Sequence, residues 1–540
     1  MRLFLRGAAW SRLLSAPMAA CGALVVTVAG CGGDGGTVDG SLDIELARQR
    51  CEQVGRLEFE GTVVSAAEFI SSGTFTRDGL TSFEVPAMCR VAMTVSPQNQ
   101  FEVWLPAQWN ERFLGVGTLV DSLMVQNVRA GFAVAGGSSG VSNGDPTWRR
   151  DENNEVSAKV LDLMEGWSHR AMHQITVRAK ATTNAFYGKA PDYSYLTGCS
   201  GPGRQVMSTA QSYPEDYDGI VAAAPALYWS RFIPSSGWIQ LSMYQELGKL
   251  MESCKLDLVN EAVVQACDGL DGVADGIVGD QRACLFDPRA LIGRETGCGT
   301  FTAADARVIQ ATWDGPHHAG SKLWYGLPLG ATFSHVYPGV SPLAAQHFRF
   351  VTGLDWDPSS SSYDEFAAVF AQGVEQYGMW DASDADLRPF GRAGGKLIMW
   401  HGWSDGIIEP EGSVQYYEEL VSAVGQSSSG TRRDQIRATQ EFARLFMAPG
   451  VGHCGPVVAP GAQPTNNPWL GIPNAPEGID AALQAVMDWV EKGVPPDRLA
   501  ASNAARGITR PLCPYPSLAK WTGQGDAASE ANYVCVQASD

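Results

Sequence analysis

The stretch YLTGCSGPGRQV, residues 195–206, predicts an apolar strand end, a tight turn and the first turn of a helix. It contains Gly198-Cys199-Ser200-Gly201, which is most of the G-x-S-x-G turn that presents a nucleophilic serine between a strand and a helix. Pro202 stands where that motif has its last glycine. A proline suits a first helical turn, because its φ fits a helix and its missing N–H needs no partner there. Pro202 is therefore compatible with a nucleophilic Ser200.

The segments on both sides of this turn predict an α/β domain with an insertion. Five short β-rich runs lie between residues 59 and 137, a helical segment covers 165–188, and the strand before Ser200 follows. This order indicates a parallel sheet with crossover helices. The alternation is lost in residues 227–392, which are rich in Trp, Gly, Pro and Ser, and it returns at residue 395. We therefore predict one α/β domain made of residues 46–226 and 393–540, interrupted by an insertion at 227–392.

Polar residues stand at the ends of three predicted strands, where ligands bind in sheets of this kind. They are Ser200, Asp405 in HGWSDG and His453 in GVGHCG. A serine hydroxyl becomes nucleophilic when a base takes its proton and a carboxylate orients that base. A histidine in a glycine-rich loop is more often structural, but the chain has only eight histidines and this one follows an apolar strand. The order Ser, Asp, His is that of α/β-hydrolases, so the three residues predict a serine hydrolase.

The N-terminus predicts an exported protein. Arg2, Arg6 and Arg12 precede an apolar run and small residues, which is the pattern of a secretory signal rather than of a membrane span. Residues 28–31, Val-Ala-Gly-Cys, resemble a bacterial lipobox in which Cys31 carries the lipid; the alternative is a soluble protein cut nearby. We expect a signal peptide at 1–30 and a flexible glycine-rich tether at 31–45. The bacterial protein is then periplasmic, a lipoprotein of the outer membrane or cell surface, or secreted.

Charge and cysteine content argue against two classes of site. The formal net charge is −19, and loss of the signal, with three arginines and no acid, makes it about −22. Such a chain has no excess of Lys and Arg to neutralise phosphates, which argues against a nucleic-acid-binding surface. Ten of the twelve cysteines remain beyond the signal and Cys31, and an even number favours five disulfides in an oxidising compartment. No CxxC pair is present, so zinc is not expected.

Several segments together resemble the tannase/feruloyl esterase family, which includes feruloyl esterases, tannases and the bacterial hydrolase of mono(2-hydroxyethyl) terephthalate. GCSGPGR, HGWSD and GHCGP are similar to the family around its catalytic residues, with a cysteine directly before Ser200 and another directly after His453. RAMHQITVRAKA, YPEDYDGIVAAAPA and CDGLDGVADGIVGD are also similar, so the resemblance covers residues 50–535. It implies a carboxylic ester hydrolase with the α/β-hydrolase fold, whose insertion forms a lid domain between the nucleophile strand and the Asp strand.

The resemblance also implies site residues. They are a Ser200–His453–Asp405 triad and an oxyanion hole formed by the N–H of Gly201 with that of Thr118. The loop at 115–119 lacks the run of glycines usual in the family, so the N–H of Leu119 is an alternative second donor. The implied disulfides are Cys199–Cys454, Cys267–Cys284, Cys51–Cys89 and Cys513–Cys535. Cys254 and Cys298 remain as the last pair, where the chain departs from the usual disulfides of the family's lid.

The segment CDGLDGVADGIVGDQRAC, residues 267–284, suits a calcium ion, because closely spaced carboxylates offer hard oxygen ligands and glycines allow sharp turns. Its spacing is not that of an EF-hand, and a solvated Asp-Gly turn is the alternative. The resemblance to the family's structural calcium loop implies Ca²⁺ held by the carboxylates and carbonyls of Asp268, Asp271, Val273, Asp275 and Ile277. The implied role is to stiffen the lid. No organic cofactor is expected.

The expected substrate is a small aromatic ester, because aromatic side chains of the lid could stack on an aromatic acid. Ile408 falls where the family places a residue of the acyl pocket. Arg349 is a candidate partner for a substrate carboxylate, and a structural salt bridge is the alternative. We expect a monomeric, exported serine esterase acting on feruloyl, galloyl or terephthaloyl esters. The competing functions are an inert surface lipoprotein that binds phenolic or glycan ligands, and a serine peptidase on the same fold.

Overall fold

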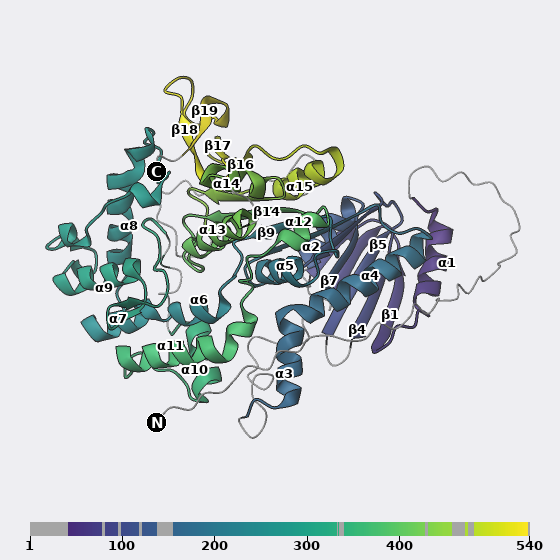
Figure 1. Cartoon of the computed structure of the whole chain (residues 1–540), viewed down its shortest axis with the longest axis horizontal. Coiled ribbons are helices and arrows are strands. Elements are labelled where there is room, and N and C mark those ends of the chain that lie inside the picture. Colours follow the sequence, from purple (N-terminus) through teal and green to yellow (C-terminus); the bar gives the residue numbers. More distant parts are fainter. Residues whose placement is uncertain are drawn as a thin grey trace, which may run out of the picture. The chain divides into compact units, whose positions relative to one another are not determined.

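A nine-stranded sheet forms the centre of the computed structural model (Figure 1). In the order in which they pair, the strands are β1 (Thr62–Ile70), β4 (Met88–Val95), β5 (Asn99–Pro106), β7 (Ala133–Gly137), β6 (Arg112–Val116), β8 (Tyr193–Cys199), β9 (Gly219–Ala223), β14 (Lys396–Gly402) and β15 (Ala443–Ala448). A separate hairpin joins β2 (Gly73–Arg77) to β3 (Thr81–Val85). The strand ends predicted before Ser200, Asp405 and His453 are those of β8, β14 and β15, which lie in one half of the sheet.

The sheet is parallel in that half and antiparallel in the other. Every pair from β7 through β6, β8, β9 and β14 to β15 is parallel. The pairs β1–β4, β4–β5 and β5–β7 are antiparallel, so the prediction of a parallel sheet is wrong for the N-terminal strands. The reason is visible between β4 and β5, where only three residues connect the strands. That length suffices for a hairpin, whereas parallel neighbours need a long crossover.

Helices cover both faces of the sheet. Alternate residues of β14 enter two different cores, Leu397 and Met399 in one and Ile398 and Trp400 in the other. The first core also receives side chains from α1 (Ile44–Val54), α3 (Ala158–Glu165), α4 (Ala171–Tyr187), α5 (Gly201–Ser212) and α13 (Glu411–Gly425), and the second from α2 (Asp121–Arg129) and α15 (Ala481–Lys492). A π-helical turn, Gly166–Arg170, separates α3 from α4. With both faces covered, the carboxyl ends of the parallel strands are the natural place for a site.

The described residues between β9 and β14 add no strand to this sheet. They form α6 (Trp229–Ser235), α7 (Trp238–Leu247), α8 (Ser253–Cys267), α9 (Ala303–Asp314), α10 (Pro342–Thr352), α11 (Tyr363–Tyr377), α12 (Arg388–Arg392) and two short strand pairs, at 295–300 and 317–322. Helices α7, α8 and α9 share a core of their own. The two ends of the insertion are joined, because the N–H of Ala382 donates to the carbonyl of Leu227 at 2.7 Å. A helical insertion on a mostly parallel sheet is the expected α/β-hydrolase arrangement with a lid.

The C-terminal part adds α14 (Arg432–Gln440) and two hairpins, β16 (Leu499–Asn503) with β17 (Ile508–Leu512) and β18 (Ser517–Trp521) with β19 (Tyr533–Gln537). The structure describes residues 41–77, 81–95, 99–117, 121–137, 155–331, 333, 340–426, 430–455, 470–472 and 480–537. The expected signal at 1–30 and Cys31 lie outside these ranges. Helix α1 begins at Ile44, so the end of the expected tether is helical. Within these ranges, no helix has the length and apolar character needed to cross a membrane.

Candidate active site

Ser200 occupies a strained turn between β8 and α5. Its φ of 66° lies in the left-handed region that side chains other than glycine rarely adopt. The N–H of Ser200 donates to the carbonyl of Ala223 at 3.1 Å, and its own carbonyl accepts from Ala226 and Arg204 at 3.1 and 2.9 Å. Neighbouring strand and helix therefore hold the turn in the conformation that raises a nucleophilic hydroxyl above the sheet.

Small residues make room for Pro202 in the first turn of α5. A Cβ on Gly198 would lie 2.7 Å from the carbonyl carbon of Pro202, and one on Gly117 would lie 2.8 Å from its Cβ. Gly203 is equally confined, because a Cβ there would lie 2.7 Å from the carbonyl oxygen of Ala223. Three glycines around the proline thus supply the close packing that the motif's last glycine normally allows.

The disulfide Cys199–Cys454 joins the residue before Ser200 to the residue after His453. The Cα atoms of the two cysteines are 5.8 Å apart, although 255 positions separate them in the chain. Cys454 also has a positive φ, 59°, so the backbone next to His453 is constrained as well. The disulfide brings the loops of both residues to the same edge of the sheet.

Asp405 lies just beyond β14, fully buried, and binds His453. Its Oδ2 is 2.7 Å from Nδ1 of His453, and its Oδ1 accepts the backbone N–H groups of Ile407 and Ile408 at 2.8 and 3.1 Å. Burial by itself would raise the pKa of Asp405, but the charge of His453 and hydrogen bonds from His401 and His453 hold it below the usual range. The ionised carboxylate therefore orients the ring and leaves Nε2 of His453 for a second partner.

A second histidine contacts the same carboxylate oxygen. Nε2 of His401, on β14, lies 3.0 Å from Oδ2 of Asp405, and its Nδ1 lies 2.8 Å from Oγ of Ser413 on α13. Both His401 and Ser413 are buried. Reasoning from the sequence gave a role in HGWSD to Asp405 alone, although His401 is the first residue of that motif. The position of a histidine four residues before the candidate Asp was the available signal.

The loop after Asp405 buries another carboxyl group. Glu409 is 5% exposed and accepts a hydrogen bond from Nε1 of Trp324, in the insertion, at 3.0 Å. Burial, reinforced by the charges of Glu411 and Asp405, raises the pKa of Glu409 to about 8 in spite of that hydrogen bond. At neutral pH Glu409 is therefore mostly protonated, whereas Asp405 is ionised.

Of the expected oxyanion donors, Gly201 is among the described residues. Gly201 is the first residue of α5, and a Cβ on it would lie 3.6 Å from the ring of Trp229. This aromatic side chain of the insertion therefore lies beside the turn of Ser200. Thr118, the expected second donor, and Leu119 lie outside the described residues.

The two expected pocket residues lie in different surroundings. Ile408 is buried, and its N–H binds Asp405. Arg349 is on α10, and its Nε donates to Oδ1 of Asp355 at 2.7 Å in a half-exposed ion pair. The structure thus gives Arg349 the salt bridge that was its alternative, and it brings Ile408 next to Asp405.

Comparisons with known proteins identify the family. The model described as tannase and feruloyl esterase matches residues 84–342 and 343–536. A probable feruloyl esterase of Arthroderma benhamiae is 34% identical over 485 residues, which cover 82% of this chain and 84% of the relative. The chain belongs to the tannase and feruloyl esterase family. It is accordingly a carboxylic ester hydrolase.

Other esterases match along most of their length. An uncharacterized esterase of Xanthomonas campestris pv. campestris is 31% identical and covers 97% of this chain and 95% of its own. The crystal structure of feruloyl esterase B from Aspergillus oryzae has a TM-score of 0.76 at 25% identity, covering 91% and 100%. Tannin acyl hydrolase from Aspergillus niger, at 22% identity and a TM-score of 0.76, covers 92% and 95% and shows the same fold.

The acidic loop at which the sequence predicts calcium follows α8 directly. Backbone N–H groups bind one oxygen of each aspartate in it. At 2.9 or 3.0 Å, Oδ1 of Asp268 accepts from Asp275 and Gly276, Oδ1 of Asp271 from Val273, and Oδ1 of Asp275 from Ile277. All five expected ligand residues therefore belong to one folded turn, in which Oδ2 of Asp268 and Oδ2 of Asp271 are the oxygens that could meet a cation, because Oδ2 of Asp275 pairs with Arg510.

Positive charge is scarce at this loop. An ion pair joins Asp275 to Arg510 of β17, and burial raises the pKa of both Asp268 and Asp271. Hard oxygen donors with unbalanced negative charge fit Ca²⁺. Within the described ranges, however, the three carboxylates do not form a group whose ligand atoms all lie within 4.8 Å of one another. The chemistry of the donors fits calcium, but the three carboxylates are not gathered around one point.

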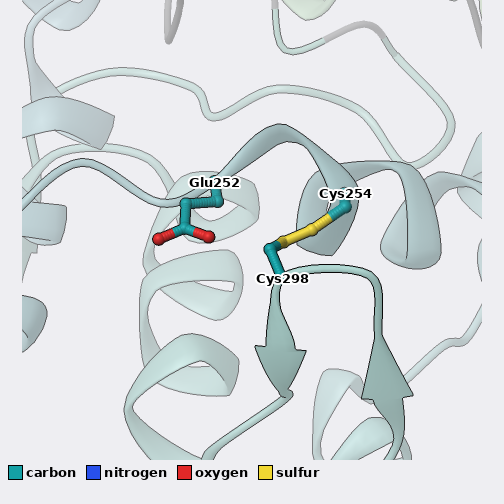
Figure 2. Close-up of side chains that lie close together, drawn as sticks. All are labelled: Glu252, Cys254 and Cys298. Carbon is teal, nitrogen blue, oxygen red and sulfur yellow. A yellow bond between two sulfur atoms is a disulfide. The ribbon is translucent and has the colours of Figure 1, made fainter.

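Among the described residues, Glu252, Cys254 and Cys298 do form such a group (Figure 2). Figure 2 shows the two cysteines joined to each other, with Glu252 beside them. Glu252 also pairs with Lys249 at 2.8 Å. Sulfur in a disulfide has no thiolate charge with which to ligate a metal, so this group is not a metal site while the disulfide is intact.

Within the described ranges there are five disulfides, each between two cysteines that the sequence analysis pairs. They are Cys51–Cys89, Cys199–Cys454, Cys254–Cys298, Cys267–Cys284 and Cys513–Cys535. Disulfides of this number are typical of proteins that fold outside the reducing cytosol.

Proposed function

We propose that the chain is a serine esterase in which Ser200, His453 and Asp405 are the catalytic triad. One observation carries this proposal: His453 is bound to buried Asp405 at 2.7 Å and is tied through a disulfide to the strained turn of Ser200. All three residues come from one chain, which agrees with a monomer. None of the steps below needs an organic cofactor.

Acylation follows from this arrangement. Because Nδ1 of His453 faces Asp405, its Nε2 is the nitrogen that takes the proton from Oγ of Ser200. The oxygen of Ser200 then attacks the ester carbonyl, and the backbone N–H of Gly201 stabilises the negative oxygen of the tetrahedral intermediate. The intermediate collapses as His453 gives its proton to the departing alcohol. The acyl group then remains esterified to Oγ of Ser200.

Deacylation repeats these steps with water. Nε2 of His453 takes a proton from a water molecule, whose oxygen attacks the carbonyl of the acyl-enzyme. Return of that proton to Oγ of Ser200 frees the carboxylic acid. Asp405 remains ionised throughout and stabilises the positive charge that His453 carries in each transition state.

The substrates we propose are esters of small aromatic acids of feruloyl, galloyl or terephthaloyl type. The names of relatives support the first two, since they include feruloyl esterases and a tannin acyl hydrolase. Trp229 beside Gly201 and Ile408 beside Asp405 place an aromatic and an aliphatic surface next to the proposed triad. Such surfaces suit a flat ring.

We further propose that the protein is exported, with Cys31 as the site of a lipid anchor. Support comes from the N-terminal sequence and from the five disulfides, which form in oxidising compartments. Mass spectrometry of the mature N-terminus tests this. A diacylglycerol adduct on Cys31 is the expected result, and an unmodified N-terminus elsewhere would contradict it.

Calcium at the acidic loop is part of the same proposal. The donors are Asp268, Asp271 and Asp275 with the carbonyls of Val273 and Ile277. Bound there, the ion would neutralise carboxylates that now have Arg510 as their cationic partner, and it would stiffen the insertion. It takes no part in the chemical steps.

The deciding experiment measures hydrolysis of methyl ferulate, methyl gallate, mono(2-hydroxyethyl) terephthalate and p-nitrophenyl acetate by the mature protein. The test variant is Ser200→Ala, and the matched control is Ser212→Ala, which changes an exposed serine of the same helix. We expect turnover of at least one aromatic ester that Ser200→Ala abolishes and Ser212→Ala leaves unchanged. Labelling by a serine-directed organophosphonate should be lost in the same variant.

Other outcomes would revise specific parts of the proposal. Cleavage of p-nitrophenyl acetate alone would keep the triad and remove the aromatic acid. Cleavage of peptides without cleavage of aryl esters would favour a serine peptidase. Full activity in Ser200→Ala would remove the triad itself.

A further inference from the structure

We propose that His401 is a positioning residue that tunes the catalytic base through Asp405. The inference rests on the proposed function, because it assigns a partner to the carboxylate of the Ser200–His453–Asp405 triad. His401 touches neither substrate nor Ser200 in this scheme. Its effect on the reaction runs through the oxygen atom that it shares with His453.

The contacts of His401 determine which of its nitrogens carries the proton. Asp405 is ionised and can only accept, so Nε2 of His401, 3.0 Å from Oδ2, is a donor. In a neutral ring Nδ1 is then an acceptor, and Oγ of Ser413 at 2.8 Å is the hydroxyl that donates to it. A hydroxyl donor at Nδ1 therefore favours the tautomer with its proton on Nε2, which is the one that supports Asp405.

The carboxylate of Asp405 is held by donors on both oxygens. Ile407 and Ile408 bind Oδ1 through their N–H groups, and His401 shares Oδ2 with His453. This arrangement leaves the carboxylate little freedom to rotate away from His453. A donor at Oδ2 also weakens the attraction of that oxygen for the proton on His453, because part of its negative charge is already satisfied.

Apart from Asp405, the residues paired with His401 are neutral. On β15, Met447 is its partner in the sheet, and α13 contributes the neutral hydroxyl of Ser413. Glu409, in the loop after Asp405, is mostly protonated at neutral pH, and burial raises the pKa of Glu411, the first residue of α13, to about 7. Replacing His401 should therefore act mainly on the charge of Asp405 and, through Asp405, on how tightly His453 holds its proton.

The test compares two replacements of His401. His401→Met keeps a side chain of similar size and removes the donor, whereas His401→Gln keeps an N–H near the position of Nε2. Without the donor, Asp405 holds the proton on His453 more tightly, so the base stays protonated to higher pH. For His401→Met we expect the acid limb of the kcat/KM profile to move up by about one pH unit, with KM unchanged and a plateau less than tenfold lower. His401→Gln should restore the wild-type profile.

Ser413→Ala is a second and milder variant. It leaves the ring of His401 in place but removes the hydroxyl that fixes its tautomer, so the acid limb should move in the same direction by a smaller amount. This variant carries the test if His401→Met does not fold, as judged by circular dichroism. An unchanged profile in both Ser413→Ala and His401→Gln, with His401→Met unfolded, would assign His401 a purely structural role.

Two further results would overturn the inference. One is a folded His401→Met enzyme whose pH profile does not move. The other is a His401→Gln enzyme that behaves like His401→Met, since the donor would then not be the relevant property. Asp405→Asn, measured in parallel, separates this failure from that of the proposed function: if Asp405→Asn retains full activity, the triad is wrong, and if it is inactive while His401→Met is unshifted, only the role of His401 is wrong.

Discussion

Two buried carboxyl groups on one loop are held in opposite protonation states. Asp405 and Glu409 are four residues apart, and both are almost completely removed from solvent. Asp405 accepts from two histidines and two backbone N–H groups, which together outweigh the cost of burying its charge. Glu409 accepts from Trp324, and burial raises its pKa to about 8. The number and charge of the donors, not the depth of burial, decide which acid is ionised.

This difference assigns different work to the two acids. An ionised Asp405 can stabilise a positive His453, whereas a protonated Glu409 can only link the loop to Trp324 of the insertion. Paired acids whose surroundings separate their pKa values are a recurrent feature of active sites. Removing the donors or the acids one at a time should show the two roles directly.

The largest effect is expected from Asp405→Asn. The amide cannot stabilise a protonated His453 and favours the wrong tautomer of the ring, so kcat should fall by about 10³- to 10⁴-fold while the fold is retained. Glu409→Gln is the matched control and should stay within a few-fold of wild type. Equal losses in the two variants, measured on one aryl ester, would contradict the division of roles.

Removal of calcium tests a third set of carboxylates, those of the acidic loop. Asp268, Asp271 and Asp275 accept backbone N–H groups, and one of them, Asp275, also pairs with Arg510, so balancing the other two carboxylates needs further positive charge. If an external ion supplies that charge, chelation should remove about 4 kcal/mol at an ion concentration near a thousand times Kd. The expected fall in Tm is several degrees. The fall in Tm on chelation should be small in Asp268→Asn. A Tm of the native protein that chelation does not change would exclude the ion.

Glu409→Gln should change how stability depends on pH. The folded-state pKa of Glu409, about 8, is above the ordinary value of 4.5, so its contribution is fully present below pH 4.5 and is lost as pH rises through 8. The stability of wild type relative to Glu409→Gln should therefore decline from pH 5 to pH 8.5, by about 4 kcal/mol. Urea unfolding at these pH values measures it. Parallel curves for the two proteins would show that Glu409 does not titrate in this range.

The smallest expected effect comes from the hydrogen bond between Trp324 and Glu409. A double-mutant cycle with Trp324→Phe and Glu409→Met isolates this contact from the packing lost with the indole ring. We expect a coupling of about 1 kcal/mol at pH 6, where the acid is protonated. A coupling indistinguishable from zero would mean that the contact does not link the insertion to the loop.

The sequence predicted the parts of the fold that depend on local pattern. Apolar runs ending in Gly-rich polar turns located β8, β14 and β15, and with them Ser200, Asp405 and His453. The antiparallel half of the sheet was missed, although the three residues between β4 and β5 already excluded a crossover. Strand content was thus easier to predict than strand direction.

The contacts of His401 and Glu409 could not be predicted in the same way. A histidine at the end of an apolar strand gives the same pattern whether it faces the core or a carboxylate. Its partner Ser413 lies on the following helix, and Trp324 reaches Glu409 from the insertion. These pairings depend on how separate elements pack, which periodicity and motif spacing do not contain.

The disulfide between Cys199 and Cys454 spans the whole insertion, so it would also join the pieces of a cut chain. A protease that cleaves the exposed turn around Leu354 and Asp355 would divide the chain into two pieces, one with Ser200 and the other with Asp405 and His453. Among the five disulfides, only Cys199–Cys454 connects those pieces, because the other four each close within one of them. Nicked protein should therefore migrate as one band without reductant and as two bands with it.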